Sequence, residues 1–154
     1  MLRVTADVNI LVSGTLFRGG ASGEILAAWQ EERLALVTCE TIVAQYEDVL
    51  RSPRIQRKYS SVNNHAVAAS AAALRTYSIL AEPVDVPRVC RDPDDDIVLA
   101  CAVRRQADYV ISGDQDLLVL SIYEGIPIVT PRGFVTILQG EEAVVSQSAS
   151  RSTP

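Results

Sequence analysis

The sequence predicts an α/β fold in which a mainly parallel sheet has helices on both of its faces. Short apolar segments that suit strands alternate with longer segments of helical periodicity, as in βαβ folds. The chain has 154 residues, of which 48% are apolar, and this is enough for one domain with a buried core. We therefore predict one domain over residues 1–140, followed by a flexible, Ser-rich tail over residues 141–154.

The elements at the start of the chain are predicted from apolar spacing and capping residues. Leu2–Ala6 is a short strand that Asp7 closes, and the following residues lead into a glycine-containing loop. Ser22 is a candidate N-cap for a helix from Gly23 to about Glu32, and a second strand spans residues 34–38.

The middle of the chain is predicted to be mostly helical. A helix from about Glu40 to Arg51 ends at Ser52-Pro53, because the residue before a proline disfavours helical backbone. A short helix follows, then an Ala-rich helix over Val62–Tyr77 and a strand over Ser78–Ala81. A basic cluster lies around the short helix and is formed by Arg51, Arg54, Arg57 and Lys58. It is either a solvated helix end or a contact for phosphate groups.

The last third of the chain is predicted to contain two helices and two strands. They are a helix from Pro93 to about Arg105, strands at Tyr109–Ile111 and Ile126–Val129, and a helix from Pro131 to Leu138 that Gly140 ends.

The helix from Pro93 has an unusually acidic start, Asp92-Pro93-Asp94-Asp95-Asp96, followed by an apolar run. Asp92 suits the N-cap, Asp94 suits solvent, and a helix dipole favours acids at this end. Four neighbouring carboxylates also repel one another, and a divalent cation would remove that repulsion. An acidic cap and a metal site are therefore both open interpretations of this segment.

Further acids are expected near the same edge of the sheet. Asp7 ends the first strand, and Asp114 and Asp116 follow the strand at Tyr109–Ile111. Ligands of parallel sheets bind at the carboxyl ends of the strands, where these side chains would meet. Oxygen ligands without His or Cys favour Mg²⁺ or Mn²⁺ over zinc, and such an ion can activate water and stabilise a transferring phosphoryl group.

Several other functions lack the residues that they need. Lys58 is the only lysine, so a phosphate-receiver domain or a haloacid-dehalogenase-type phosphatase lacks its late lysine, and no P-loop is present. His65, the only histidine, has no nucleophile motif beside it. The net charge of −5 argues against a simple cationic nucleic-acid binder. The absence of a signal peptide or membrane-length segment, together with three unpaired cysteines, predicts a cytoplasmic protein.

Five sequence blocks, in this order, resemble the PIN domain, a metal-dependent ribonuclease fold. The blocks are residues 7–13, residues 46–53, Asp92–Asp96 with Ala100 and Ala102, residues 107–118, and Thr130-Pro131. The resemblance covers about residues 2–138 and is strongest to the branch regarded as toxins of toxin–antitoxin pairs. It implies a three-layer α/β/α sandwich, an RNA substrate hydrolysed to 3′-hydroxyl and 5′-phosphate ends, and an antitoxin protein as partner.

The resemblance also implies roles for particular residues. The metal ligands and catalytic residues would be Asp7, Asp95, Asp114 and Asp116, with Asp96 as a rival ligand beside Asp95. Ser112 would orient the pocket, and Asn9 would hydrogen-bond within it. Where the family usually has its second acid, this chain has Gln45, with Asp48 as a substitute on the same helix face and Glu47 pointing elsewhere.

Three functions follow for testing. The first is a Mg²⁺- or Mn²⁺-dependent endoribonuclease. The second is a catalytically weak or inactive module of this fold that binds RNA or protein, because Gln45 removes one charge. The third is a metal-dependent phosphatase of small substrates. A homodimer or antitoxin contact is expected around Leu16 and Phe17.

Overall fold

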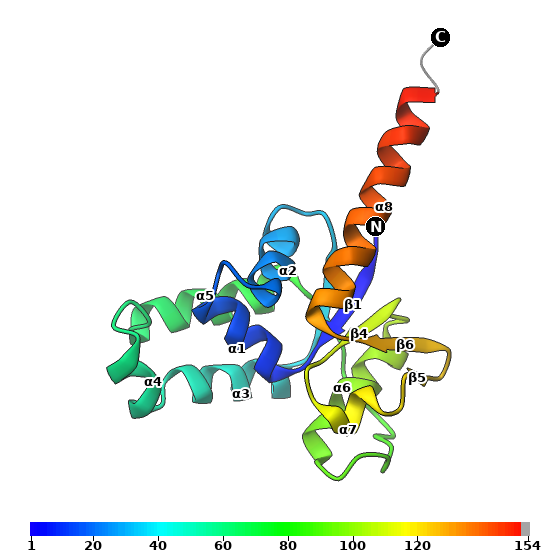
Figure 1. Ribbon diagram of the computed structural model, residues 1–154. Helices are drawn as coiled ribbons and strands as arrows, with labels where there is room; N and C mark the ends of the chain where they lie inside the picture. The colour runs from blue at the N-terminus through cyan, green and yellow to red at the C-terminus, as the bar shows by residue number, and fades with distance from the viewer. Residues whose placement is uncertain (152–154) are drawn as a thin grey trace.

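The computed structural model describes the backbone of residues 1–151 and the side chains of residues 1–147. Its elements, in chain order, are β1 (Arg3–Ala6), α1 (Val8–Leu16), α2 (Ala21–Gln30), β2 (Ala35–Thr38), α3 (Glu40–Leu50), α4 (Pro53–Lys58), α5 (Asn64–Tyr77), β3 (Ile79–Leu80), α6 (Pro93–Arg104), β4 (Tyr109–Ile111), α7 (Gln115–Leu118), β5 (Ile122–Tyr123), β6 (Ile126–Val129) and α8 (Pro131–Arg151). Figure 1 shows helices around a central sheet, with the end of α8 projecting away from it. Within the described residues, no helix combines the length and the apolar character needed to span a membrane.

The described strands form one sheet in the order β3-β2-β1-β4-β6-β5. Every neighbouring pair is parallel except β5 and β6, which are antiparallel. The predicted α/β class with a mainly parallel sheet is confirmed, whereas β5 was not predicted because its two residues leave no periodic signal. Strands β2 and β3 lie on one side of β1 in the sheet, and β4, which comes later in the chain, lies on its other side. Ligands of open α/β sheets bind at such a switch point.

Helices pack on both faces of this sheet. Helix α6 contacts β1, β2 and β4, and its residues Leu99 and Cys101 are completely buried, as its all-round apolar sequence predicts. Helix α8 packs on β4, where the ring of Phe134 lies edge-on to that of Tyr109 at 5.8 Å between centroids. The arrangement agrees with the predicted α/β/α sandwich.

The first helix was not predicted from the sequence, because the residues between Asp7 and the glycine-containing loop form α1 before that loop begins. This segment is rich in β-branched residues, which lower helix propensity. Burial of Ile10, Leu11 and Gly14 and capping by Asp7 outweigh that preference. A side chain at Gly14 would lie 2.7 Å from the backbone oxygen of Ser22, so α2 packs closely at this point.

Two smaller predictions about helices also change. Helix α2 begins at Ala21 with Gly20 as its N-cap residue, so Ser22 is inside the helix and does not cap it. The helical spacing of the apolar residues of α3 predicts that Ile42, Val43, Tyr46, Val49 and Leu50 are buried, and all of them are except Val49.

The last helix is longer than predicted, because α8 passes through Gly140 and continues to Arg151. A glycine inside a helix costs only about 1 kcal/mol relative to alanine, and the following run Glu-Glu-Ala suits a helix. An ion pair of 2.7 Å between Arg33 and Glu142 also holds this extension against the turn that follows α2. Residues 141–151 of the predicted tail are therefore helical, and residues 152–154 lie outside the described residues.

Candidate metal centre

The site forms where β1 and β4 end side by side. Ala6 pairs with Ile111 in the parallel register, so the next residues, Asp7 and Ser112, emerge together at the carboxyl edge of the sheet. Ser112 is fully buried, and its hydroxyl donates a hydrogen bond to Oδ2 of Asp7. The same hydroxyl accepts a hydrogen bond from the backbone N–H of Asp114 at 2.9 Å. One serine therefore joins the two predicted acids, which are 107 residues apart in sequence.

Three helix N-termini point toward this edge, and each has an aspartate as its N-cap. Asp7 caps α1 by accepting from the N–H of Ile10 at 2.9 Å. Asp92 caps α6 and Asp114 caps α7, each accepting from the N–H two residues later at 2.9 Å. The predicted cap role of Asp92 is confirmed. Capping and helix dipoles account for much of the acidity of this region.

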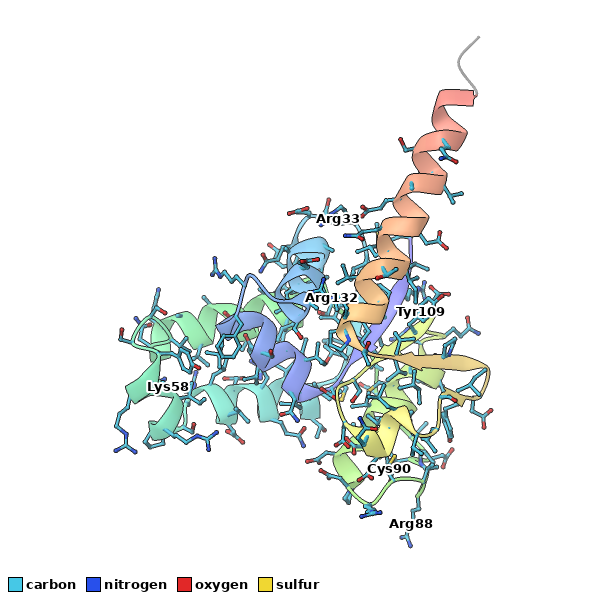
Figure 2. All side chains as sticks on the ribbon, in the orientation of Figure 1. Arg33, Lys58, Arg88, Cys90, Tyr109 and Arg132 are labelled. Atoms are coloured by element: carbon cyan, nitrogen blue, oxygen red, sulfur yellow. The ribbon has the colours of Figure 1, made fainter. Side chains whose placement is uncertain are left out.

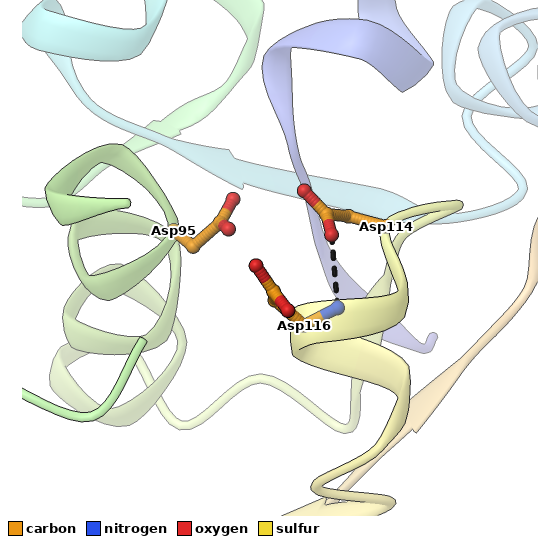
Figure 3. A group of neighbouring side chains, drawn as sticks. All are labelled: Asp95, Asp114 and Asp116. Atoms are coloured by element: carbon orange, nitrogen blue, oxygen red, sulfur yellow. Dashed lines mark hydrogen bonds between the residues drawn. The ribbon is translucent and has the colours of Figure 1, made fainter. Parts of the chain in front are cut away.

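A group of three carboxylates is not explained by capping alone. Asp95, Asp114 and Asp116 each offer one oxygen, and these oxygens all lie within 4.8 Å of one another. Figure 3 shows Asp95 reaching from α6 toward Asp114 and Asp116 at the start of α7. Asp95 is only 7% exposed, and its Oδ2 has no hydrogen-bond partner among the described residues. A buried carboxylate oxygen without a partner is costly, and a bound cation would satisfy it.

Electrostatics at the group agree with this geometry. The pKa of Asp95 is raised from an ordinary 3.8 to about 7, first by burial and then by the charges of Asp114, Asp92, Asp7 and Asp116. Burial also raises the pKa of Asp7, although the hydrogen bond from Ser112 opposes that rise. Asp95 and Asp7 are thus poorly solvated and lie close to other carboxylates, which is the condition that a divalent cation relieves.

A cavity of about 310 Å³ opens beside the group. Its lining includes Asp7, Asn9, Gln45, Asp48, Asp92, Asp94, Asp95 and Asp114. Most of the predicted site residues therefore meet at one place, although Asp7 and Asp48 lie in the wall and outside the group of three. Asn9 is exposed, and the structure gives its side chain no hydrogen bond within the described residues. An oxygen-rich, negatively charged wall of this kind suits Mg²⁺ or Mn²⁺.

Gln45, which stands where the family usually has its second acid, lines the cavity from α3. The amide nitrogen of Gln45 donates to Oδ1 of Asp94 at 2.8 Å, which joins α3 to the start of α6. Asp48 lies one turn further along α3 and lines the same cavity. Glu47 instead pairs with Arg75 at 2.5 Å on α5, so the prediction that it points elsewhere is confirmed.

Asp96, the predicted rival ligand, has another role. Its Oδ1 accepts hydrogen bonds from the N–H groups of Val89 at 3.1 Å and Cys90 at 2.8 Å. Successive side chains of a helix point about 100° apart, so Asp95 faces the group while Asp96 faces the loop before α6. Asp96 holds this loop in place and lies outside the group of three.

One further residue beside the group was not predicted from the sequence. The guanidinium of Arg91 lies 4.0 Å from Oδ1 of Asp116, and its side chain is 90% exposed. Arg91 directly precedes the acidic run, and a cation adjacent to four acids in sequence is the only signal that could have identified it.

Comparison with known proteins supports the resemblance found in the sequence. A family model of the PIN domain matches residues 3–116, which include every element from β1 to the start of α7. Over 119 residues the chain is 29% identical to an uncharacterized protein of Methanocaldococcus jannaschii, covering 77% of this chain and 75% of that protein. PIN domains form a nuclease superfamily whose members are generally metal-dependent hydrolases. This chain belongs to the PIN domain family.

Proposed function

We propose that this protein is an endoribonuclease that uses Mg²⁺ or Mn²⁺ to hydrolyse phosphodiester bonds of RNA. The observation that carries the proposal is the buried Oδ2 of Asp95, which has no partner among the described residues and lies beside Asp114 and Asp116. A structural acid would be expected to find a hydrogen-bond donor when it is this deeply buried. An acid that lines a cavity and has one oxygen without a hydrogen-bond donor is the arrangement that a metal ligand requires.

The residues divide into ligands and groups that position them. Asp95, Asp114 and Asp116 would hold the cation, and Asp7 would complete the acidic wall. When bound, the ion supplies charge neutralisation and Lewis acidity for phosphoryl transfer. Ser112 fixes the Asp7 carboxylate and the Asp114 backbone in one orientation. The converging N-termini of α1, α6 and α7 add positive potential that favours a phosphate group.

The test of this function is cleavage of labelled single-stranded RNA with Mn²⁺, Mg²⁺ or EDTA. Cleavage should require a metal and fall by at least about a hundredfold in Asp114→Asn. Asp85→Asn is the matched control, because Asp85 is exposed and has a positive φ of 53° that asparagine adopts easily. Metal-independent cleavage, or equal activity in the two variants, would contradict the proposal.

A second candidate function is supported by the bond between Gln45 and Asp94. Gln45 brings no charge to the cavity, and its amide engages one of the acids, so the metal site can be weaker than in relatives with an acid at this position. A weak site would leave a protein that binds RNA or a protein partner without cutting. Folded protein that binds RNA but shows no cleavage with any of the metals would favour this candidate.

The toxin role and the antitoxin partner are proposals that rest on the resemblance of the sequence. A nuclease toxin stops growth when it is expressed alone, and the arrest depends on its active site. We expect expression to arrest bacterial growth and Asp114→Asn to remove the arrest. Arrest by both proteins would show that toxicity does not come from cleavage.

Size-exclusion chromatography with light scattering tests the predicted homodimer.

A further inference from the structure

The charges of this acidic protein are strongly segregated along the chain. None of its 19 Asp and Glu residues lies between residues 49 and 81, whereas five of its 14 Lys and Arg residues do. Two of these five have acidic partners, since Arg75 pairs with Glu40 and Glu47, and Arg51 lies 3.4 Å from Glu47. The other three are on α4 and belong to no ion pair within the described part of the chain, namely Arg54, Arg57 and Lys58.

Helix α4 presents these three cations from a fixed position. Ile55 is buried beneath the helix, with 9% of its surface exposed. The amide nitrogen of Gln56 donates to the backbone oxygen of Leu50 at 3.3 Å and to Oδ1 of Asn64 at 3.1 Å, which ties α4 to α3 and α5. The cations are all exposed. Figure 2 shows Lys58 at the end of the molecule opposite the sheet.

A purely structural explanation accounts for only part of this cluster. Arg57 and Lys58 lie in the last turn of α4, where the helix dipole favours positive charge. Arg54 lies in the first turn, where the dipole is unfavourable for a cation, and no acid offsets it there. The exposed positive charge of Arg54 therefore gains nothing from its own helix.

Aromatic side chains lie directly beside the cations. The ring of Tyr59 lies edge-on to Phe17, with 5.7 Å between centroids, and Lys58 Nζ lies 5.6 Å from the centre of the Tyr59 ring. Phe17 is 51% exposed, although a phenyl ring gains by burial. Cations next to exposed aromatic rings are the combination that binds single-stranded nucleic acids, because phosphates pair with the cations and bases stack on the rings.

This region is connected to the candidate metal centre by α3. Gln45, Asp48 and Val49 line the cavity, and α3 then runs directly into α4, as Figure 1 shows. Arg54 lies six positions after Asp48 in the sequence, so their Cα atoms are at most about 22 Å apart even for an extended chain. A strand of RNA in the cavity can therefore reach α4 with its next few nucleotides.

We propose that Arg54, Arg57, Lys58, Phe17 and Tyr59 form a basic surface that binds single-stranded RNA and leads it to the acidic cavity. The proposal rests on the proposed nuclease function for its substrate, but the surface acts before cleavage and without metal. It also solves an electrostatic problem, because the acids of the cavity repel a polyanion and the basic surface attracts it nearby. The exposed aromatic ring favours RNA over an acidic protein as the ligand.

The test is binding of a fluorescently labelled single-stranded oligoribonucleotide in EDTA, measured by anisotropy over a series of salt concentrations. Arg54→Gln/Arg57→Gln should weaken binding about tenfold and reduce the slope of log K against log salt by about 1.4, at 0.7 per lost phosphate contact. Arg104→Gln/Arg132→Gln is the matched control, because it removes two exposed arginines elsewhere and should leave the slope unchanged. Phe17→Ala should weaken binding without changing the slope.

Each outcome decides the proposal separately from the nuclease function. Asp114→Asn should still bind RNA in EDTA, and this retained binding supports the surface independently of whether the parent protein cleaves RNA. Equal losses in the α4 variant and its control would overturn the proposal, and so would no RNA binding by the folded parent protein. Binding of poly-glutamate as tight as RNA, and lost in the same variant, would also overturn it.

Discussion

The hydroxyl of Ser112, at the end of β4, donates a hydrogen bond to Asp7 at the end of β1. The same hydroxyl accepts a hydrogen bond from the N–H of Asp114. The relationship depends on the parallel register of the two strands, which places residues 7 and 112 next to each other. It holds two separated acids in one orientation at the switch point of the sheet. The geometry of the candidate site is therefore built into the centre of the fold.

Replacing this hydroxyl should destabilise the protein. Ser112→Ala leaves Oδ2 of Asp7 and the N–H of Asp114 without their common partner in a buried position, which costs about 1–3 kcal/mol of unfolding free energy. Urea unfolding measures the loss. Ser61→Ala, at an exposed serine, is the control and should change the unfolding free energy by less than about 0.5 kcal/mol. Equal stability of the two variants would show that the bridge has little energetic value.

The raised pKa of Asp95 predicts how stability depends on pH without metal. The folded protein keeps the Asp95 proton up to about pH 7, whereas the unfolded chain releases it near 3.8. Stability in EDTA should therefore fall as pH rises through this interval, and burial of Asp7 acts in the same direction. Asp95→Asn should reduce the decline and raise the melting temperature above pH 7. An unchanged decline in this variant would assign the effect to other groups.

The exchange of Gln45 for an acid should strengthen the metal site. Gln45→Glu adds a negative charge to the cavity and replaces the bond to Asp94 with repulsion. Affinity for Mn²⁺ should rise about tenfold, or about 1.4 kcal/mol. Stability in EDTA should decrease at the same time. Gln30→Glu adds the same charge at an exposed position of α2 and should change neither quantity. Equal effects of the two substitutions would mean that net charge alone matters.

The helical extension at the C-terminus should be dispensable for the fold. Among the residues of α8 whose side chains are described, the buried ones are Phe134, Val135 and Leu138, all before Gly140. Beyond Gly140 the described ion pair is that of Arg33 with Glu142, and an exposed pair of this kind contributes less than about 1 kcal/mol. A chain ending at Gly140 should keep RNA cleavage and lose no more than this in urea unfolding. A loss of several kcal/mol would show that the extension is part of the core.

Much of the site could be predicted because the sequence indicates where the strands end. Asp7 and Asp114 each follow a short apolar strand, and parallel strands present their carboxyl ends at one edge. Asp95 heads an apolar helix whose burial is evident from composition. Asp7, Asp95 and Asp114 line one cavity, and Asp116 lies beside Asp95 and Asp114 because α7 begins directly after Asp114.

The remaining features depend on tertiary structure that a single sequence does not reveal. Asp95 and Asp96 are adjacent acids that a single sequence does not distinguish as ligands. The orientation of α6 about its own axis decides that Asp96 faces Val89 and Cys90. Helix α1 forms against its local propensity because the core buries one face and Asp7 caps its start. The bond from Gln45 to Asp94 joins two helices whose packing no local pattern encodes.

Calorimetric titration of the metal-free protein with Mn²⁺ measures whether Asp95, Asp114 and Asp116 form a divalent cation site. We predict saturable binding at one site and at least about tenfold weaker binding in Asp95→Asn, or about 1.4 kcal/mol. Asp85→Asn should bind like the parent protein. Binding of Mn²⁺ by folded Asp95→Asn as tightly as by the parent protein would contradict the assignment of the cation site to these three aspartates. Absence of Mn²⁺ binding by the parent protein would contradict it as well.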